Sequence, residues 1–207
     1  MNNYILSKGL KKATIAFLLF IVFDILDFEL LSYLFLFFTF SLLYIYRNPK
    51  PSFLASESED IIKAVCDAKV TDITQIEDET YGFVVEMESN CFTKAILYPP
   101  FKSKVEDIKL QRGSRVVKHS RLFDKLNERL EVVFKNEKAS IKVVHTLKRT
   151  PESIEVFVKT SQEVEPNKPY GYAINAVTKI YLPKEVDLRI SVSDKLSAGE
   201  TIIGYIK

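Results

Sequence analysis

The stretch Leu130-Glu-Val-Val-Phe-Lys-Asn-Glu-Lys-Ala-Ser-Ile-Lys-Val-Val-His-Thr146 shows the pattern that decides the fold of most of this chain. It holds two short runs, Leu130–Phe134 and Ser140–Thr146, that are separated by a polar break. In each run β-branched or aromatic residues alternate with polar ones, which places the apolar side chains on one face. This alternation favours an antiparallel sheet over a helix.

Similar runs recur along the rest of the chain beyond residue 60. They are Lys69–Ile76, Tyr81–Met87, Phe92–Leu97, Ile154–Lys159, Thr178–Leu182, Leu188–Val192 and Thr201–Ile206. The only convincing helical segment there is short, around Arg121–Arg129. We therefore predict an all-β, barrel-sandwich-like soluble domain with little helix over residues 61–207.

A weak internal repeat is consistent with that fold. Val164-Glu-Pro-Asn167 followed by Gly171-Tyr172 resembles Leu196-Ser-Ala-Gly199 followed by Gly204-Tyr205, with a gap of one residue. Such hairpin pairs build the barrel-sandwich of lipoyl- and biotinyl-type domains, although two unrelated turns explain the match almost equally well. The lysine motif of those domains is absent, so neither group is predicted.

Residues 1–50 differ in composition and predict a membrane anchor. Two apolar runs, 13–26 and 30–46, flank a short segment with three carboxylates, Asp24, Asp27 and Glu29. One continuous helix would hold these charges near the bilayer centre at a cost of roughly 2.5–3.5 kcal/mol each, so a transmembrane helical hairpin is predicted. One interfacial helix followed by a single span is the nearest alternative. A cleaved signal peptide is disfavoured because no small-residue cleavage site follows Phe23.

The flanking charges predict how the anchor is oriented. Lys8, Lys11 and Lys12 accompany the first run, and Arg47 and Lys50 follow the second. Positive charge at both outer ends places both in the cytoplasm. Beyond Pro49, residues 51–60 are predicted to form a linker. We expect an inner, cytoplasmic-membrane protein whose soluble domain faces the cytoplasm.

Charge and motif content exclude several classes of function. The chain has 29 Lys/Arg and 27 Asp/Glu, of which residues 1–50 carry five and three, so the remainder is neutral and no nucleic-acid partner is predicted. Cys66 and Cys91 lack the spacing of a metal site, and a disulfide between them is left open. No catalytic motif is found, and structural roles are favoured for His119 and His145.

The segment 102–125 is locally basic and is a candidate for contact with anionic lipid. The residues expected to make that contact are Lys102, Lys109, Arg112, Arg115 and Lys118. A basic residue near an anionic bilayer contributes about 1 kcal/mol. A solvated strand edge, where lysines discourage aggregation, explains the same charges equally well.

Six segments, in order, resemble those of short phosphatidylserine and archaetidylserine decarboxylases. Those segments are Tyr46-Arg-Asn-Pro49 (family FFRDP), Ala64-Val-Cys-Asp67-Ala-Lys69-Val-Thr-Asp-Ile73 (SPADGKVxxI), Pro100-Phe101 (SPFDVHVNR), Asn127-Glu-Arg129 (NER), Ile180-Tyr-Leu-Pro183, and Asp187–Ile203 with Ala198-Gly-Glu200 inside it. Each match is weak alone, but the set runs from the anchor to the C-terminus.

The resemblance implies a chemistry whose residues are only partly kept. Family members cleave themselves before the serine of a Gly-Ser pair and convert that serine into a pyruvoyl group. The family serine falls on Ala176 counting back from Pro183, or on Val177 counting forward from Gly171. The family histidine falls on Lys104, a poor base at neutral pH, while the family aspartate is retained as Asp67. No pyruvoyl cofactor is therefore predicted.

Three hypotheses follow from this pattern. The first is a non-catalytic, membrane-anchored homologue that binds phospholipid or a partner, either a family homologue or a second copy. The second is an active phosphatidylserine decarboxylase with a displaced cleavage site, and Thr178 is the nearest hydroxyl. The third is a structural membrane-assembly protein.

Overall fold

The computed structural model describes residues 7–47 and 60–206. The chain divides into two compact units, Met1–Lys50 and Pro51–Lys207. The predicted linker, apart from Asp60, and the Asn48-Pro49 end of the first family-like segment lie outside the described residues.

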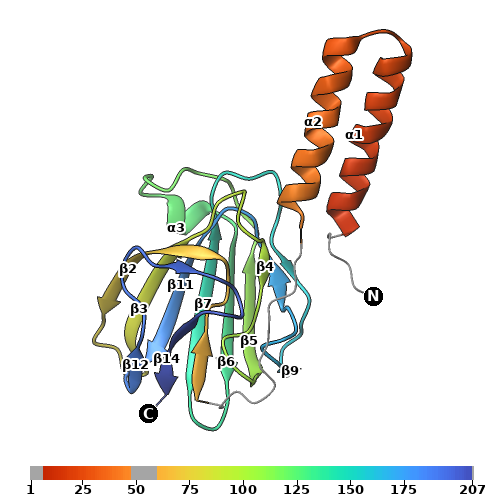
Figure 1. Cartoon of the computed structure of the whole chain (residues 1–207). Coiled ribbons are helices and arrows are strands. Elements are labelled where there is room, and N and C mark those ends of the chain that lie inside the picture. The colour runs from red at the N-terminus through yellow and green to blue at the C-terminus, as the bar shows by residue number, and fades with distance from the viewer. Residues whose placement is uncertain (1–6, 48–59, 207) are drawn as a thin grey trace. The chain divides into compact units, whose positions relative to one another are not determined.

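The first unit is a helical hairpin formed by α1 (Ser7–Ile25) and α2 (Glu29–Ile45) (Figure 1). The helices are joined by a tight turn in which Asp27 has a φ of 57°. Phe23 and Phe35 stack across the pair with ring centroids 5.3 Å apart. A Cβ on Gly9 would lie 2.1 Å from the Cβ of Tyr46, so the helices approach closely there because residue 9 has no side chain. Two helices and a turn lie where the sequence predicted a hairpin, although α1 begins six residues before the predicted first run.

The prediction that this hairpin crosses a membrane is not supported. In the described ranges, 7–47 and 60–206, no helix combines the length and the hydropathy that a membrane span requires. α1 includes three lysines and Asp24 among its 19 residues, and α2 has only 17 residues.

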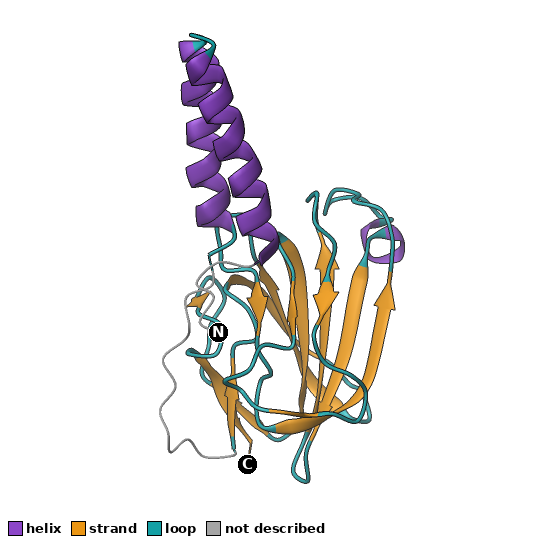
Figure 2. Cartoon of the chain, turned by 90° about the vertical axis from the view of Figure 1, so that its right-hand side faces the viewer, coloured by secondary structure: helices purple, strands orange, loops and turns teal. Residues whose placement is uncertain are grey.

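The second unit is built almost entirely of strands, which confirms the all-β prediction (Figures 1 and 2). Its only α-helix among the described residues is α3 (Phe123–Leu126), inside the segment predicted to be helical. The strands are β1 (Ile61–Lys63), β2 (Ala68–Gln75), β3 (Tyr81–Glu88), β4 (Ile96–Leu97), β5 (Ser103–Gln111), β6 (Arg129–Lys135), β7 (Ser140–Leu147), β8 (Glu155–Val156), β9 (Glu163–Val164), β10 (Gly171–Tyr172), β11 (Ala176–Pro183), β12 (Val186–Leu188), β13 (Lys195–Leu196) and β14 (Ile202–Ile206).

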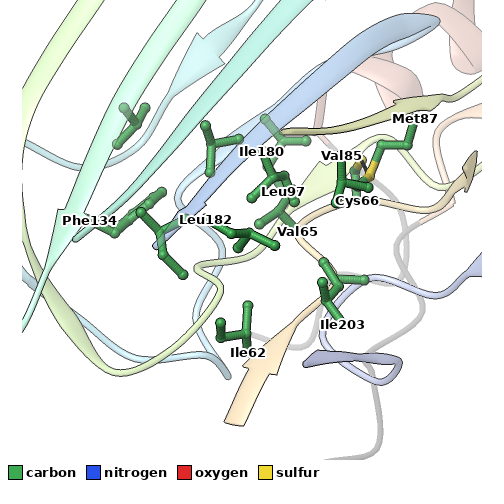
Figure 3. Packing of buried hydrophobic residues seen from close by; sticks show 14 of the residues in the cluster. Ile62, Val65, Cys66, Val85, Met87, Leu97, Phe134, Ile180, Leu182 and Ile203 are labelled. Atoms are coloured by element: carbon green, nitrogen blue, oxygen red, sulfur yellow. Dashed lines mark hydrogen bonds between the residues drawn. The ribbon is translucent and has the colours of Figure 1, made fainter. Parts of the chain in front are cut away.

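These strands form one large sheet and two small ones around a single core. The large sheet has the order β13-β2-β3-β11-β7-β6-β5-β9, and the small sheets are β1-β14-β12 and β4-β10-β8. Side chains of the small sheets meet those of the large sheet in the core (Figure 3). Figure 3 shows Ile62, Leu97 and Ile203 from the small sheets with Val85, Ile180, Leu182 and Phe134 from the large one.

The weak sequence repeat corresponds to a structural repeat. β13 and β9, which open the two matched segments, are the opposite edge strands of the large sheet and pair with β2 and β5. Gly204 and Gly171 lie in β14 and β10, the central strands of the small sheets. Both β2 and β5 also carry a bulge near their start. The unit therefore consists of two topologically equivalent halves that meet where β7 pairs with β11.

Several strands differ from the prediction for local reasons. β5 was not predicted because its bulge between Val105 and Asp107 interrupts the alternation, and four of its nine residues are charged. Phe92–Leu97 was predicted as a strand, but only its last two residues are extended, since the side chain of Asn90 accepts the N–H groups of Phe92 and Thr93 and forms a turn. The strand predicted over Ile154–Lys159 is likewise shorter in the structure, where only β8 is extended.

Candidate functional site

Ala176, the position matched to the family serine, is buried at the start of β11 beside Ser89. The Ala176 N–H donates to Ser89 Oγ at 2.9 Å. The Ser89 N–H and hydroxyl donate to the Ala176 carbonyl at 3.0 and 3.2 Å. Ser89 thus places a hydroxyl next to this peptide, although nothing in the sequence around residue 89 indicated it.

Asn175 has the backbone conformation of a glycine. Its φ is 56°, in the left-handed region that glycine adopts freely and asparagine tolerates. Its Nδ2 donates to the Arg149 carbonyl at 2.8 Å, and its own carbonyl accepts the Lys148 N–H at 2.8 Å. This conformation favours the alignment that places the family Gly-Ser pair on Asn175-Ala176.

Asp67 lies at the same end of the large sheet as Ala176. It immediately precedes β2, in which Lys69 is opposite Glu88 of β3, and Glu88 is in turn opposite Val177 of β11. Asp67 Oδ1 accepts the N–H of Ala198 at 2.8 Å, and Oδ2 is 3.8 Å from Lys94 Nζ. Asp67 therefore fixes the loop that carries the family-like Ala198-Gly-Glu200 segment.

Lys104, the position matched to the family histidine, lies at the other end of the sheet. It is opposite Lys135 of β6, which is opposite Ser140 of β7, whereas Ala176 is opposite Leu147 of β7. At roughly 3.3 Å per residue the two rows lie about 23 Å apart along β7. Lys104 instead lines an open groove of about 850 Å³ between β5, β9 and the β6–β7 turn. The structure brings Asp67 and Ala176 to one end but does not bring Lys104 to them.

Comparison with known proteins gives the same family as the ordered segments. A phosphatidylserine decarboxylase proenzyme of Desulfotalea psychrophila is 24% identical over 184 residues, covering 86% of this chain and 85% of that protein. A phosphatidylserine decarboxylase proenzyme of Geotalea uraniireducens is 24% identical over 221 residues, covering 99% and 98%. No protein-family model matches the chain. These similarities over most of the chain support a diverged member of the phosphatidylserine decarboxylase family.

The segment Asn127-Glu-Arg129, which resembles the family NER segment, is a structural clasp. The Asn127 side chain accepts the Val116 N–H at 2.7 Å and donates to the carbonyls of Val116 and Leu147, each at 2.8 Å. It therefore ties the loop that precedes α3 to the β7 residue opposite Ala176. The Asn127 side-chain amide is buried from water, so these bonds satisfy the donors and the acceptor that water would otherwise satisfy.

Glu128 is the charged centre of the same clasp. Its carboxylate is buried and accepts bonds from Arg112, from Arg115 Nη2 at 2.6 Å and from the Ile154 N–H at 2.8 Å. Burial alone would raise the pKa of Glu128, but the bonds from Arg115, Ile154 and Arg112 lower it overall. The carboxylate is therefore charged at neutral pH and holds three segments together.

Most of the basic residues expected to contact lipid are paired with carboxylates. Arg112 and Arg115 bind Glu128, Lys118 binds Glu86 and Glu88, and Lys109 lies 3.1 Å from Asp107. Lys102 lines the same groove as Lys104. Pairing reduces the charge that the set offers to a lipid surface.

A buried polar cluster lies where the two halves of the β unit meet, and it was not predicted from the sequence. His145 of β7 is opposite Thr178 of β11, and its Nδ1 lies 2.8 Å from Thr178 Oγ1. His145 Nε2 lies 2.5 Å from the Tyr170 hydroxyl, and Cys66 Sγ donates to Thr178 Oγ1 at 3.6 Å. All four side chains are buried. No sequence motif connects these residues, because the contacts arise only from strand pairing.

Burial keeps this cluster neutral. It lowers the pKa of His145 to about 3 and raises the pKa of the Cys66 thiol to about 12. It also raises the pKa of Tyr170 well above its ordinary value. Both cysteines are free, so the disulfide left open by the sequence is not formed. Among residues 7–47 and 60–206, no group of histidine, cysteine, aspartate or glutamate side chains is arranged to hold a metal ion.

Proposed function

We propose that this chain is a membrane-associated, non-catalytic homologue of phosphatidylserine decarboxylase that binds phospholipid at a cytoplasmic membrane surface, with its β unit on the cytoplasmic side. The observation that carries the proposal is the buried Ala176 at the position of the family serine. A pyruvoyl group is made from serine, so this position does not fit the family's prosthetic group.

The separation of the family positions supports the loss of catalysis. Lys104 occupies the histidine position but lies at the opposite end of the large sheet from Ala176. A base must come within hydrogen-bond reach of the proton that it removes. Asp67 is near, but it is engaged with the Ala198 N–H and Lys94.

The surface of the helical hairpin supports membrane association. Large apolar side chains of α2, among them Leu30, Phe37 and Phe40, are exposed. A contiguous apolar surface of this kind marks a contact with lipid or protein. An amphipathic or apolar helix can bind a bilayer without crossing it.

A mass measurement on the purified full-length chain tests the loss of processing. We expect a single intact polypeptide. A fragment comprising residues 176–207 with a carbonyl in place of its amino terminus would show that the chain processes itself, and would refute the proposal.

Vesicle flotation tests the association with lipid. The full chain should float with vesicles of phosphatidylserine and phosphatidylethanolamine. Replacing Phe37 and Phe40 by glutamate should greatly reduce flotation, because charges then interrupt the apolar face of α2. Phe157→Glu, the same change at an exposed site of the β unit, is the matched control and should still float. A wild-type chain that stays with the unbound fraction would refute the proposed membrane role.

An active decarboxylase with a displaced cleavage site is the second candidate. It is favoured by the Ser89 hydroxyl, 2.9 Å from the Ala176 nitrogen, and by the bond between Thr178 and His145. The same mass measurement distinguishes it, since any internal cleavage near these residues would leave two chains.

A further inference from the structure

The loop of residues 114–126, here named the clasped loop, is closed at its base by main-chain bonds. The Ser114 N–H donates to the Leu126 carbonyl at 2.8 Å, and the Glu128 N–H donates to the Ser114 carbonyl at 3.3 Å. The Asn127 side chain binds both main-chain groups of Val116. In Figures 1 and 2 the short helix of this loop, α3, lies beyond one end of the large sheet.

The clasped loop has one buried apolar side chain and three that are exposed to solvent. Phe123 of α3 is only 5% exposed and anchors the loop. By contrast Val117, Leu122 and Leu126 are 56%, 49% and 46% exposed. Leu122 and Leu126 are four residues apart and joined by the first helical bond, so they share one side of α3.

Cations flank these apolar residues and are available to an external anion. Within the described part of the chain, Lys118 forms ion pairs with Glu86 and Glu88, and Asp124 forms an ion pair with Lys179. Arg121 and Lys125 are exposed and make no ion pair with any described residue. An apolar cluster beside unpaired cations is complementary to an anionic bilayer surface, where acyl chains lie beneath phosphates.

We propose that the clasped loop is a membrane contact of the β unit, separate from the hairpin, that inserts Val117, Leu122 and Leu126 into an anionic bilayer while Arg121 and Lys125 bind lipid phosphates. The inference rests on the membrane association proposed above. It extends that proposal, because Asn127 ties the loop to Leu147, the residue opposite Ala176. Insertion of the loop holds the Asp67–Ala176 end of the sheet at the lipid surface.

The chain has no tryptophan, so a single introduced tryptophan reports its own surroundings. Leu122→Trp replaces an exposed side chain in the full-length protein, and Leu126→Trp provides a second reporter in the same loop. Glu137→Trp is the matched control, since residue 137 is exposed in the β6–β7 turn at the other end of β6. Each variant is bound to phosphatidylserine–phosphatidylcholine vesicles that carry bromine on the acyl chains.

For Leu122→Trp and Leu126→Trp, bromolipid should reduce emission by about half, as expected for a side chain 5–10 Å below the headgroups. Glu137→Trp should be unaffected. Adding Arg121→Gln and Lys125→Gln should restore most of the loop emission, and raising the salt concentration should act in the same direction.

Flotation of the same samples separates the two proposals. A chain that floats while both loop tryptophans remain unquenched would overturn the inference and leave the proposed function intact. A chain that does not float would overturn both. An emission shift that depends on protein concentration, without quenching by bromolipid, would assign the loop to a second copy or a protein partner and would also overturn the inference.

Discussion

His145 should make the stability of the β unit depend on pH in a range where few other groups titrate. The imidazole is buried between Thr178 and Tyr170, and desolvation lowers its pKa to about 3. In the unfolded chain a histidine has a pKa near 6.5. Between these values the unfolded state binds a proton that the folded state does not, so acidification favours unfolding.

The size of the effect follows from this difference. Because the folded pKa is depressed, stability is fully present above about pH 6.5 and is lost progressively as the pH falls towards 3. From pH 7 to pH 5 the free energy of unfolding should fall by about 2 kcal/mol. The pKa values of Glu88 and Glu128 are also lowered, so they act in the same direction but mainly below their ordinary values, at more acidic pH.

Urea unfolding of the full chain in detergent micelles, followed by circular dichroism of the β-sheet, measures this slope. His145→Gln keeps a donor and an acceptor but cannot titrate, so it should remove most of the change between pH 7 and pH 5. His119→Gln alters the only other histidine, which is exposed, and should keep the change. A wild-type protein that is equally stable at pH 7 and pH 5, or a slope that survives in His145→Gln, would refute the reasoning.

Three further changes test the candidate site and its clasp through thermal unfolding. Asn175→Gly should cost no more than about 1 kcal/mol, whereas Asn175→Val should cost about 2–3 kcal/mol because a β-branched residue is strained at a φ of 56°; equal costs would contradict the assigned conformation. Glu128→Gln should lower the free energy of unfolding by about 2–3 kcal/mol, since Arg115 loses its buried charged partner. As a control, Glu106→Gln removes the carboxylate of the exposed Lys135–Glu106 pair and should change the free energy of unfolding by less than about 0.5 kcal/mol. Asp67→Asn keeps an acceptor for the Ala198 N–H and should cost less than about 1 kcal/mol, whereas Asp67→Ala should cost about 1–2 kcal/mol; a large loss in Asp67→Asn would show that the charge itself holds the loop.

The β-rich architecture could be predicted because local alternation and burial agree. β6 has one buried face, formed by Leu130, Val132 and Phe134, so its side chains alternate in the sequence as they do in space. β7 starts with the same alternation, but it is buried on both faces from Val143 onward. β5 could not be predicted, because a bulge shifts its alternation and four of its nine residues are charged. The helical hairpin was predictable from its two apolar runs and the acidic turn between them, but a membrane crossing was not a safe extension of that pattern.

The candidate site was less predictable because it depends on long-range strand pairing. The order of the family-like segments does not reveal that Lys104 and Ala176 lie in rows about 23 Å apart along β7. Likewise, His145 has no partner nearby in sequence, yet pairing with β11 places it beside Thr178. From the sequence, Glu128 could be recognised only as part of the NER-like segment. That Arg112 and Arg115 bind its carboxylate became clear only from the structure.

Several residues of the family-like segments make structural contacts in this chain. Asp67 holds the Ala198 loop, Asn127 closes the clasped loop, and Glu128 neutralises two arginines. Each of these contacts joins segments of the protein in a chain that has alanine at position 176. The matched aspartate and the NER segment are therefore weak indicators of activity in this chain, because their side chains are engaged with protein atoms. Position 176, which matches the family serine, is the informative one, and there the chain has alanine.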